Sequence, residues 1–160
     1  ISVKNITTGQ LNFADCKRIS RADHAIFTRR CKPEFQDILY TKIGATYGRP
    51  AIVNTKEEFS IYVSVALIKP QPEILNPFFL RELLRTDYLK WQAENAISGI
   101  GVPDLHLIVI KNFHIPVPPI TQQQKFATLV EQVERLRTKQ RESVRELENL
   151  FQSLMQRYFG

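Results

Sequence analysis

The pair Pro118-Pro119 divides the 160-residue chain into two parts with different sequence patterns. Proline has no backbone N–H and fixes φ, so an element before this pair must end there, and a helix can begin directly after it. From Thr121 to Phe159 the chain contains neither proline nor glycine. A helix of that length extends roughly 55 Å at about 1.5 Å per residue. We therefore expect a globular domain at residues 1–119 and a long helix at residues 120–160.

The composition is that of a folded chain with one core, since 43% of the residues are hydrophobic and 24% are charged. No apolar run approaches the roughly 20 residues that cross a bilayer, so we expect no membrane partner and a cytoplasmic location. Cys16 and Cys31 are the two cysteines, and their spacing matches neither a disulfide framework nor a zinc site.

The sequence pattern predicts an α+β fold: a globular part with a small mixed sheet and short helices, followed by a long C-terminal coiled-coil helix. Alternating or β-branched apolar runs predict strands at residues 1–6, 37–43, 51–53, 59–69, 105–110 and 114–117. Ser20 before Asp23 predicts a short helix at residues 21–29, and Asn76-Pro77 is a typical helix start. After Pro77, one helical face carries apolar residues that we expect in the core: Leu80, Leu83, Leu84, Tyr88 and Trp91.

The long helix carries an apolar seam. Thr121 and Gln124 have the spacing of a capping box, which predicts the helix start. Gln140 and Ser143 interrupt the seam, and such polar positions fix the register of one chosen partner helix at some cost in stability. Packing of the helix on its own domain is the alternative. The seam residues expected to bind a partner helix are Phe126, Leu129, Val133, Leu136, Val144, Leu147, Leu150 and Leu154.

The loop at residues 41–50 is the strongest local signal for a ligand. Its two glycines allow close approach of the backbone, while basic and hydroxyl side chains suit phosphate. It lacks the Gly-Lys-Ser/Thr ending of a nucleotide-binding loop. A purely structural hairpin remains an equal alternative from these residues alone. The candidate DNA-binding residues here are Thr41, Lys42, Thr46, Tyr47 and Arg49.

Basic residues also cluster at residues 17–32, within a chain of formal net charge +6. Asp23 is the only acidic residue among them, and clusters of this kind suit phosphate oxygens. A solvated surface is the alternative reading. The candidates for phosphate contact are Arg29, Arg30 and Lys32.

Motifs for catalysis are missing from the sequence, so we expect a protein that is not an enzyme and that uses no cofactor of its own. Asn76-Pro77-Phe78-Phe79 lacks the second proline of the amino-methyltransferase motif, and no glycine-rich turn for S-adenosylmethionine is present. The three histidines lie far apart, and the carboxylates show no nuclease spacing.

Three segments together resemble the specificity (S) subunit of type I restriction-modification enzymes. They are residues 37–49 (DILYTKIGATYGR), residues 99–105 (GIGVPDL) and residues 112–124 (NFHIPVPPITQQQ). The last resembles the join between the target recognition domain of that family and its conserved spacer helix. The match covers nearly the whole chain.

This resemblance implies a non-catalytic reader of one half of a bipartite double-stranded DNA sequence. The partners it implies are methyltransferase (M) subunits, a restriction (R) subunit and a second spacer helix, from the same parent chain or from a second copy in a homodimer. It places the loops 42–49 and 98–104 near DNA, and in the second loop it singles out Ser98, Gly99 and Gly101. Thr46, Tyr47 and Arg49 are then the candidates for reading base edges in the major groove.

The chain also departs from the S-subunit pattern. Gln36 stands where the family usually has glycine before the Asp-Ile-Leu strand. Only one recognition domain and one spacer helix are present, so we expect an excerpt of a longer subunit or a half-subunit that pairs with a copy of itself. The alternatives are the recognition region of a single-chain restriction-methylation enzyme and a helical assembly module that does not bind DNA.

Overall fold

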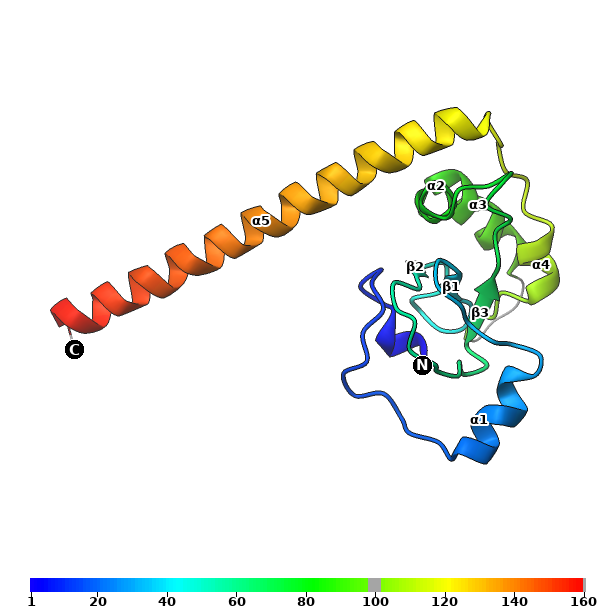
Figure 1. Ribbon diagram of the computed structural model, residues 1–160, viewed down its shortest axis with the longest axis horizontal. Helices are drawn as coiled ribbons and strands as arrows, with labels where there is room; N and C mark the ends of the chain where they lie inside the picture. The colour runs from blue at the N-terminus through cyan, green and yellow to red at the C-terminus, as the bar shows by residue number, and fades with distance from the viewer. Residues whose placement is uncertain (98–101, 160) are drawn as a thin grey trace.

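The computed structural model describes residues 1–97 and 102–159. A globular body is followed by one long helix that projects far beyond it (Figure 1). Along the chain the elements are the 3-10 helix η1 (Val3–Asn5), α1 (Arg21–Thr28), β1 (Ile38–Thr41), β2 (Pro50–Ile52), β3 (Val65–Ile68), α2 (Pro77–Leu83), α3 (Asp87–Ala96), α4 (Leu107–Lys111) and α5 (Ile120–Phe159).

The sheet has the order β2-β1-β3, and both pairings are antiparallel. Leu39 at its centre faces Ala51 on one side and Leu67 on the other. The α+β class with a long C-terminal helix is confirmed. The sheet of the described residues is antiparallel rather than mixed, because a short loop turns the chain directly from β1 back into β2, as antiparallel neighbours allow.

Strand β1 organises two hydrophobic clusters, one on each face of the sheet. Its side chains alternate in direction, as in any strand. Ile38 and Tyr40 belong to the cluster that includes Leu80 of α2, Leu84 at the C-cap of α2, and Ala93 of α3. On the opposite face, a second cluster gathers buried residues from the N-terminal segment, the three strands and the connection between β2 and β3: Ile6, Leu39, Ala51, Val53, Phe59 and Val65.

The helix predicted after Asn76 starts as expected. The Asn76 side chain accepts hydrogen bonds from the amides of Phe78 (2.9 Å) and Phe79 (3.2 Å), and Pro77 occupies the first turn. The helix predicted at residues 21–29 is also confirmed as α1, because the Ser20 hydroxyl caps it by accepting from the Asp23 amide.

The prediction of one core face from Leu80 to Trp91 is wrong for its last two residues, Tyr88 and Trp91. Tyr88 is 50% exposed and Trp91 is 60% exposed. The reason is a break between two helices, where the hydroxyl of Thr86 caps α3 and changes the direction of the helical face. Leu89 and Ala93 are buried instead.

The strand predicted at residues 1–6 is a turn with the helix η1. Asn5 explains the difference, because its side chain satisfies backbone groups that a strand neighbour would otherwise satisfy. It accepts from the Ser2 amide (2.9 Å) and donates to the carbonyls of Asn12 (3.1 Å) and Ala14 (3.2 Å). Ile6 is fully buried all the same.

The predicted strand at residues 105–110 is wrong, because this segment contains the helix α4. The carbonyl of His106 accepts hydrogen bonds from the amides of Val109 and Ile110. A short apolar run fits a buried strand and a buried helix equally well, so its periodicity could not decide between them.

Residues 114–117 do not form a strand either, and the strand expected at residues 59–69 is shorter than predicted. Both backbone groups of His114 bond to the side chain of Gln92, at 2.9 Å each, in place of a neighbouring strand. Within residues 59–69 only Val65–Ile68 pairs with β1.

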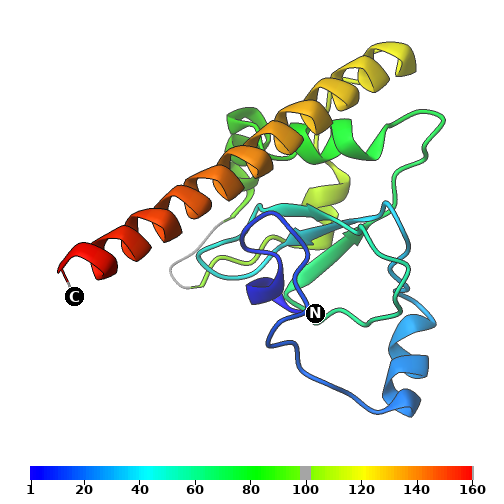
Figure 2. The ribbon, with the colours of Figure 1, turned by 60° about the vertical axis from the view of Figure 1, so that its left-hand side comes forward.

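Helix α5 begins at Ile120, as the predicted boundary at residue 120 has it, but the capping box expected at Thr121 is wrong. The carbonyl of Pro119 accepts from the amides of Gln122 and Gln123, so Thr121 lies inside the first turn and is not the N-cap. Figure 2 shows the first turns of α5 passing beside α2 before the helix leaves the body. Among the described residues, no helix has both the length and the apolar character needed to span a bilayer.

Gln36 adopts a left-handed backbone conformation, with φ of 72°. We predict that Gln36→Gly raises the free energy of unfolding by about 0.5–1 kcal/mol, because glycine has no Cβ to disfavour positive φ. Urea denaturation measures this change. The control Gln36→Ala keeps the Cβ and should give no gain, and an equal gain in both variants would contradict the explanation.

Candidate nucleic-acid interface

Two loops that are far apart in the sequence meet beside the end of β1. The Gly44 amide donates to the Pro103 carbonyl (2.9 Å), and the Leu105 amide donates to the Lys42 carbonyl (2.7 Å). Ile43 and Asp104 form the antiparallel bridge between these two bonds. The loop at residues 42–49 and the segment 103–105 therefore form one joined surface, which we call the paired-loop surface.

Lys42 connects the two halves of the paired-loop surface. Its ammonium donates to the carboxylate of Asp104 at 3.1 Å, and the Lys42 side chain is only 15% exposed. A cation that is paired and largely covered is less available to a phosphate than a free one. The structure thus gives Lys42 a role in holding the loops together.

Thr41 fixes the shape of the loop from below. It is fully buried, and its hydroxyl donates to the Thr46 carbonyl (2.6 Å) and accepts from the Arg49 amide (2.8 Å). Gly48 has φ of 80°, a conformation that suits glycine, and its amide bonds to the Thr41 carbonyl. Thr41 is therefore a support for the loop, because a fully buried hydroxyl cannot reach a ligand at the surface.

Tyr40 lies under the same loop with its hydroxyl buried and without a hydrogen-bond partner in the described part of the chain. Burial, with a smaller contribution from the neighbouring Tyr47, raises the pKa of Tyr40 to about 12. The phenol is consequently neutral at physiological pH. The floor of the loop contributes no charge of its own.

The outer side of the loop carries the groups that remain available. Arg49 is exposed, and one of its guanidinium nitrogens donates to the Thr7 carbonyl at 2.7 Å, which anchors the side chain, while the other donors of the guanidinium form no hydrogen bond within residues 1–97 and 102–159. Thr46 and Tyr47 are half-buried beside it. These three residues are the part of the predicted site that the structure brings together at the surface.

Three predicted residues, Ser98, Gly99 and Gly101, lie outside the described residues. The structure does describe the segment that follows them. Asp104 belongs to the described end of this loop; the sequence analysis placed the loop 98–104 near DNA without singling out Asp104.

The predicted basic residues 29–32 form a second surface. Arg29 and Arg30 are exposed at the end of α1, while Lys32 lies 3.6 Å from the carboxylate of Glu58. His24 holds α1 to the body through the Ser60 hydroxyl, at 2.8 Å. Figure 2 shows α1 on one side of the domain and the loop after β1 on the other. The structure does not bring these basic residues together with the paired-loop surface.

The seam of α5 is a third exposed surface. Leu129, Leu136 and Leu147 have exposed fractions of 60%, 67% and 65%. Toward its own domain the helix turns a face with buried Gln123 and Ala127, and the first seam residue, Phe126, also meets Phe79 of α2. The alternative of a helix packed on its own domain therefore holds only for the start of α5, since from Arg135 to Phe159 every residue is exposed.

Metal chemistry has no visible support in the described ranges 1–97 and 102–159. They contain no group of three or more histidine, cysteine or acidic side chains arranged to hold an ion. Both cysteines are free thiols.

A family model described as "Type I restriction modification DNA specificity domain" matches residues 6–149 of the chain. Among curated proteins, the type I restriction enzyme EcoBI specificity subunit of Escherichia coli is 27% identical over 163 aligned residues. That alignment covers 99% of this chain and 34% of the relative, so the chain spans about a third of the relative's length.

Solved structures share the fold. The HsdS subunit from Thermoanaerobacter tengcongensis superimposes with a TM-score of 0.62 at 19% identity, over 99% of this chain and 42% of that one. A structure solved in work on complex assembly and conformational transition of the type I R-M system gives a TM-score of 0.57 at 22% identity, over 81% of this chain and 35% of that one.

We predict that Lys42 and Asp104 are energetically coupled. In a double-mutant cycle with Lys42→Ala and Asp104→Ala, the coupling free energy should be about 1 kcal/mol, because the pair is partly sheltered from water. Urea denaturation of the four proteins measures it. The exposed pair Lys90–Glu94, at 3.7 Å on α3, is the control and should give a value near zero. Equal coupling in the two cycles would show that the loops are not held by this contact.

Proposed function

This chain belongs to the family of type I restriction-modification DNA specificity domains, and we propose that it recognises one half of a bipartite double-stranded DNA site for such an enzyme. In this proposal residues 1–119 are the target recognition domain and residues 120–160 are the spacer helix. The observation that carries the proposal is the paired-loop surface, in which two separate loops of a specificity-domain fold converge and leave an anchored arginine exposed.

The paired-loop surface has the chemistry that base recognition requires. Arginine can donate two hydrogen bonds to guanine, and hydroxyl groups can donate or accept at any base edge in the major groove. We assign this reading to Arg49, Thr46 and Tyr47, and we place Ser98, Gly99 and Gly101 of the second predicted loop near the DNA. Thr41 and Lys42 act indirectly in this scheme, because they hold the loop in shape.

The basic surface at the end of α1 serves a different purpose. Arg29 and Arg30 are exposed, and Lys32 lies beside them. Contacts to phosphate position a protein on the duplex without reading its sequence. We therefore assign phosphate binding to these three residues, on the flank of the site.

Catalysis is assigned to the partners of this chain. The relatives are specificity subunits, and the proposal gives the chain no cofactor and no reaction of its own. Methyltransferase and restriction subunits would supply methylation and cleavage, as cytoplasmic partners of a DNA-bound reader.

The exposed seam of α5 is the basis for proposing a partner helix. Large apolar side chains at 3-4 spacing are exposed along about 30 residues, which is the pattern of a coiled coil that lacks its second strand. We propose that a second spacer helix covers it, either from the same parent chain or from a second copy. Gln140 and Ser143 then fix the register, because sliding one helix along the other would place polar side chains opposite apolar ones.

Arg49→Ala tests the DNA-binding surface. For the chain assembled with its methyltransferase subunit, affinity for the target duplex should fall and should depend less on sequence at one position, because a base contact is lost. Fluorescence anisotropy over a series of salt concentrations and single-base changes measures this, with the target identified by mapping methylated adenines in the source genome. Lys56→Ala, which removes an exposed lysine between β2 and β3, is the control.

A sequence-specific reader should also lose affinity steeply as salt rises, because bound cations are released from the duplex. Binding that does not respond to salt, or an Arg49→Ala variant that binds like the parent, would count against the assignment.

Leu147→Asp tests the seam. A carboxylate at the centre of a helix pair cannot be solvated there, so association should weaken by at least tenfold while the globular domain stays folded. Sedimentation of the chain, alone and with the methyltransferase subunit, measures the association state. Gln152→Asp places the same charge on the opposite side of the helix and should leave association unchanged. An unaltered association state in the Leu147 variant would refute the seam.

A further inference from the structure

Helix α5 is attached to its own domain at two separated places, and this attachment gives it a direction. We propose that the contacts of Arg81 and Gln123 with α5 and its surroundings set the angle of the spacer helix, and thereby the half-site separation that the protein accepts. These residues would be positioning residues for spacing, although they do not touch DNA. The inference rests on the proposed function for its DNA consequence, whereas the fixed angle stands on the contacts alone.

Gln123 is the first attachment. It is fully buried, and its carbonyl oxygen accepts from the Asn76 amide at 2.8 Å. Its side-chain nitrogen donates to the carbonyls of Ile74 (2.9 Å) and Pro118 (2.7 Å). The amide thus uses both of its hydrogens and its oxygen, on the segment before α2 and on the first proline of the pair. Rotation of α5 about its own axis would break all three bonds together and leave buried polar groups unpaired.

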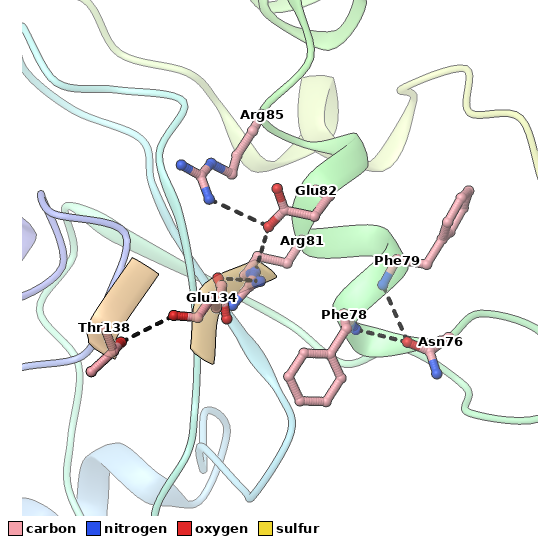
Figure 3. Close-up of polar contacts among 8 residues, drawn as sticks. All are labelled: Asn76, Phe78, Phe79, Arg81, Glu82, Arg85, Glu134 and Thr138. Carbon is pink, nitrogen blue, oxygen red and sulfur yellow. Dashed lines mark hydrogen bonds and ion pairs between the residues drawn. The ribbon is translucent and has the colours of Figure 1, made fainter. Parts of the chain in front are cut away.

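Arg81 forms the second attachment, three turns further along α5. Figure 3 shows its side chain between Glu82 of α2 and Glu134 of α5. Its Nη2 donates to Glu134 at 2.7 Å and its Nε donates to Glu82 at 2.8 Å, while the guanidinium lies 5.7 Å from the centre of the Phe78 ring. Arg81 is only 5% exposed. A covered cation resists losing a carboxylate partner, because water cannot readily replace it.

An aromatic contact lies between these two attachments. The rings of Phe79 and Phe126 meet edge to face, with centroids 5.8 Å apart. A single contact would act as a hinge. Contacts from Gln123 to Glu134 extend over roughly 16 Å of helix, and attachment over such a length defines an axis.

The length of α5 beyond the second attachment magnifies any change in angle. The described helix continues to Phe159, which is about 38 Å beyond Glu134 at 1.5 Å per residue. A tilt of about 10° at the junction would move the tip by about 7 Å, the rise of roughly two base pairs. In the proposed assembly the second spacer helix runs antiparallel to α5, which puts the second recognition domain at that tip. A loose junction would therefore tolerate several spacings, and a fixed junction would select one.

Inter-spin distances in the full chain test the fixed angle. Spin labels on cysteines at Asn95 of α3 and Gln152 of α5, with Cys16 and Cys31 replaced by serine, report the distance from body to rod. Dilution with unlabelled chain removes signals between copies. The parent should give one narrow distribution. Glu134→Arg places a cation against Arg81, so the distance distribution should shift or broaden. The change should be about 5 Å or more, the displacement expected at Gln152 for a tilt of about 10°.

Two further variants keep this test decisive. Glu134→Gln retains an acceptor for Arg81 without the charge and should broaden the distribution less than Glu134→Arg does. Glu131→Arg makes the same charge change one turn earlier, at an exposed residue that forms no ion pair with the described residues, and should match the parent. Circular dichroism and thermal melting show whether each variant is folded. A folded Glu134→Arg protein with the parental distance distribution would overturn the proposal.

The same variants in the assembled enzyme test the consequence for DNA. Affinities are measured for duplexes whose half-sites have the parental spacing or one changed by one or two base pairs. The parent should prefer one spacing strongly. In Glu134→Arg, the ratio of the affinity for that spacing to the affinity for a changed spacing should approach one. An altered angle with an unaltered spacing preference would refute the role in spacing. If the parental complex shows no spacing preference, the proposed function fails, while the inter-spin distances still decide whether Arg81 and Glu134 fix the helix.

Discussion

A helix of 40 residues is about 60 Å long, and a domain of roughly 120 residues has a radius of gyration of only about 14 Å. The body can therefore cover only the beginning of α5, and it does so with a face that contains Gln123 and Ala127. The apolar seam lies on another face and stays exposed from Leu129 onward. Because of this mismatch of length, the apolar seam stays exposed along most of the rod, and a small change of angle at the junction produces a large displacement at the tip.

The globular part uses its sheet to join segments that are distant in sequence. β1 is the central strand, and its end continues into the loop whose backbone pairs with residues 103–105. Buried groups such as Thr41 and the Lys42–Asp104 pair give this loop its shape, so the exposed Arg49 is presented on a stable support. A reader of DNA needs such support, because hydrogen bonds to base edges discriminate only when the donors are held in position.

Local chemistry made part of this structure predictable. Asn76-Pro77, Ser20 and the proline pair mark helix starts by interactions within a few residues, and these starts are found within one residue of the predicted positions. The exposed seam of α5 followed from its spacing alone. Short apolar runs were less informative, because residues 105–110 contain a helix where a strand was predicted, and Asn5 closes a turn within residues 1–6 through side-chain bonds that no periodicity reveals. Long-range partners were not predictable either, since nothing near Arg81 in the sequence points to Glu134.

The central claim is that one end of this molecule reads DNA while the exposed seam at the other end holds a partner helix. Hydrogen–deuterium exchange of the full chain, measured alone, with the methyltransferase subunit and with the target duplex added, tests both parts in one experiment. We predict that assembly slows exchange in residues 140–158 and that DNA then slows exchange in residues 42–49 and 103–105. Exchange in residues 140–158 that stays as fast as in the isolated chain, or loops that do not respond to the duplex, would contradict the account.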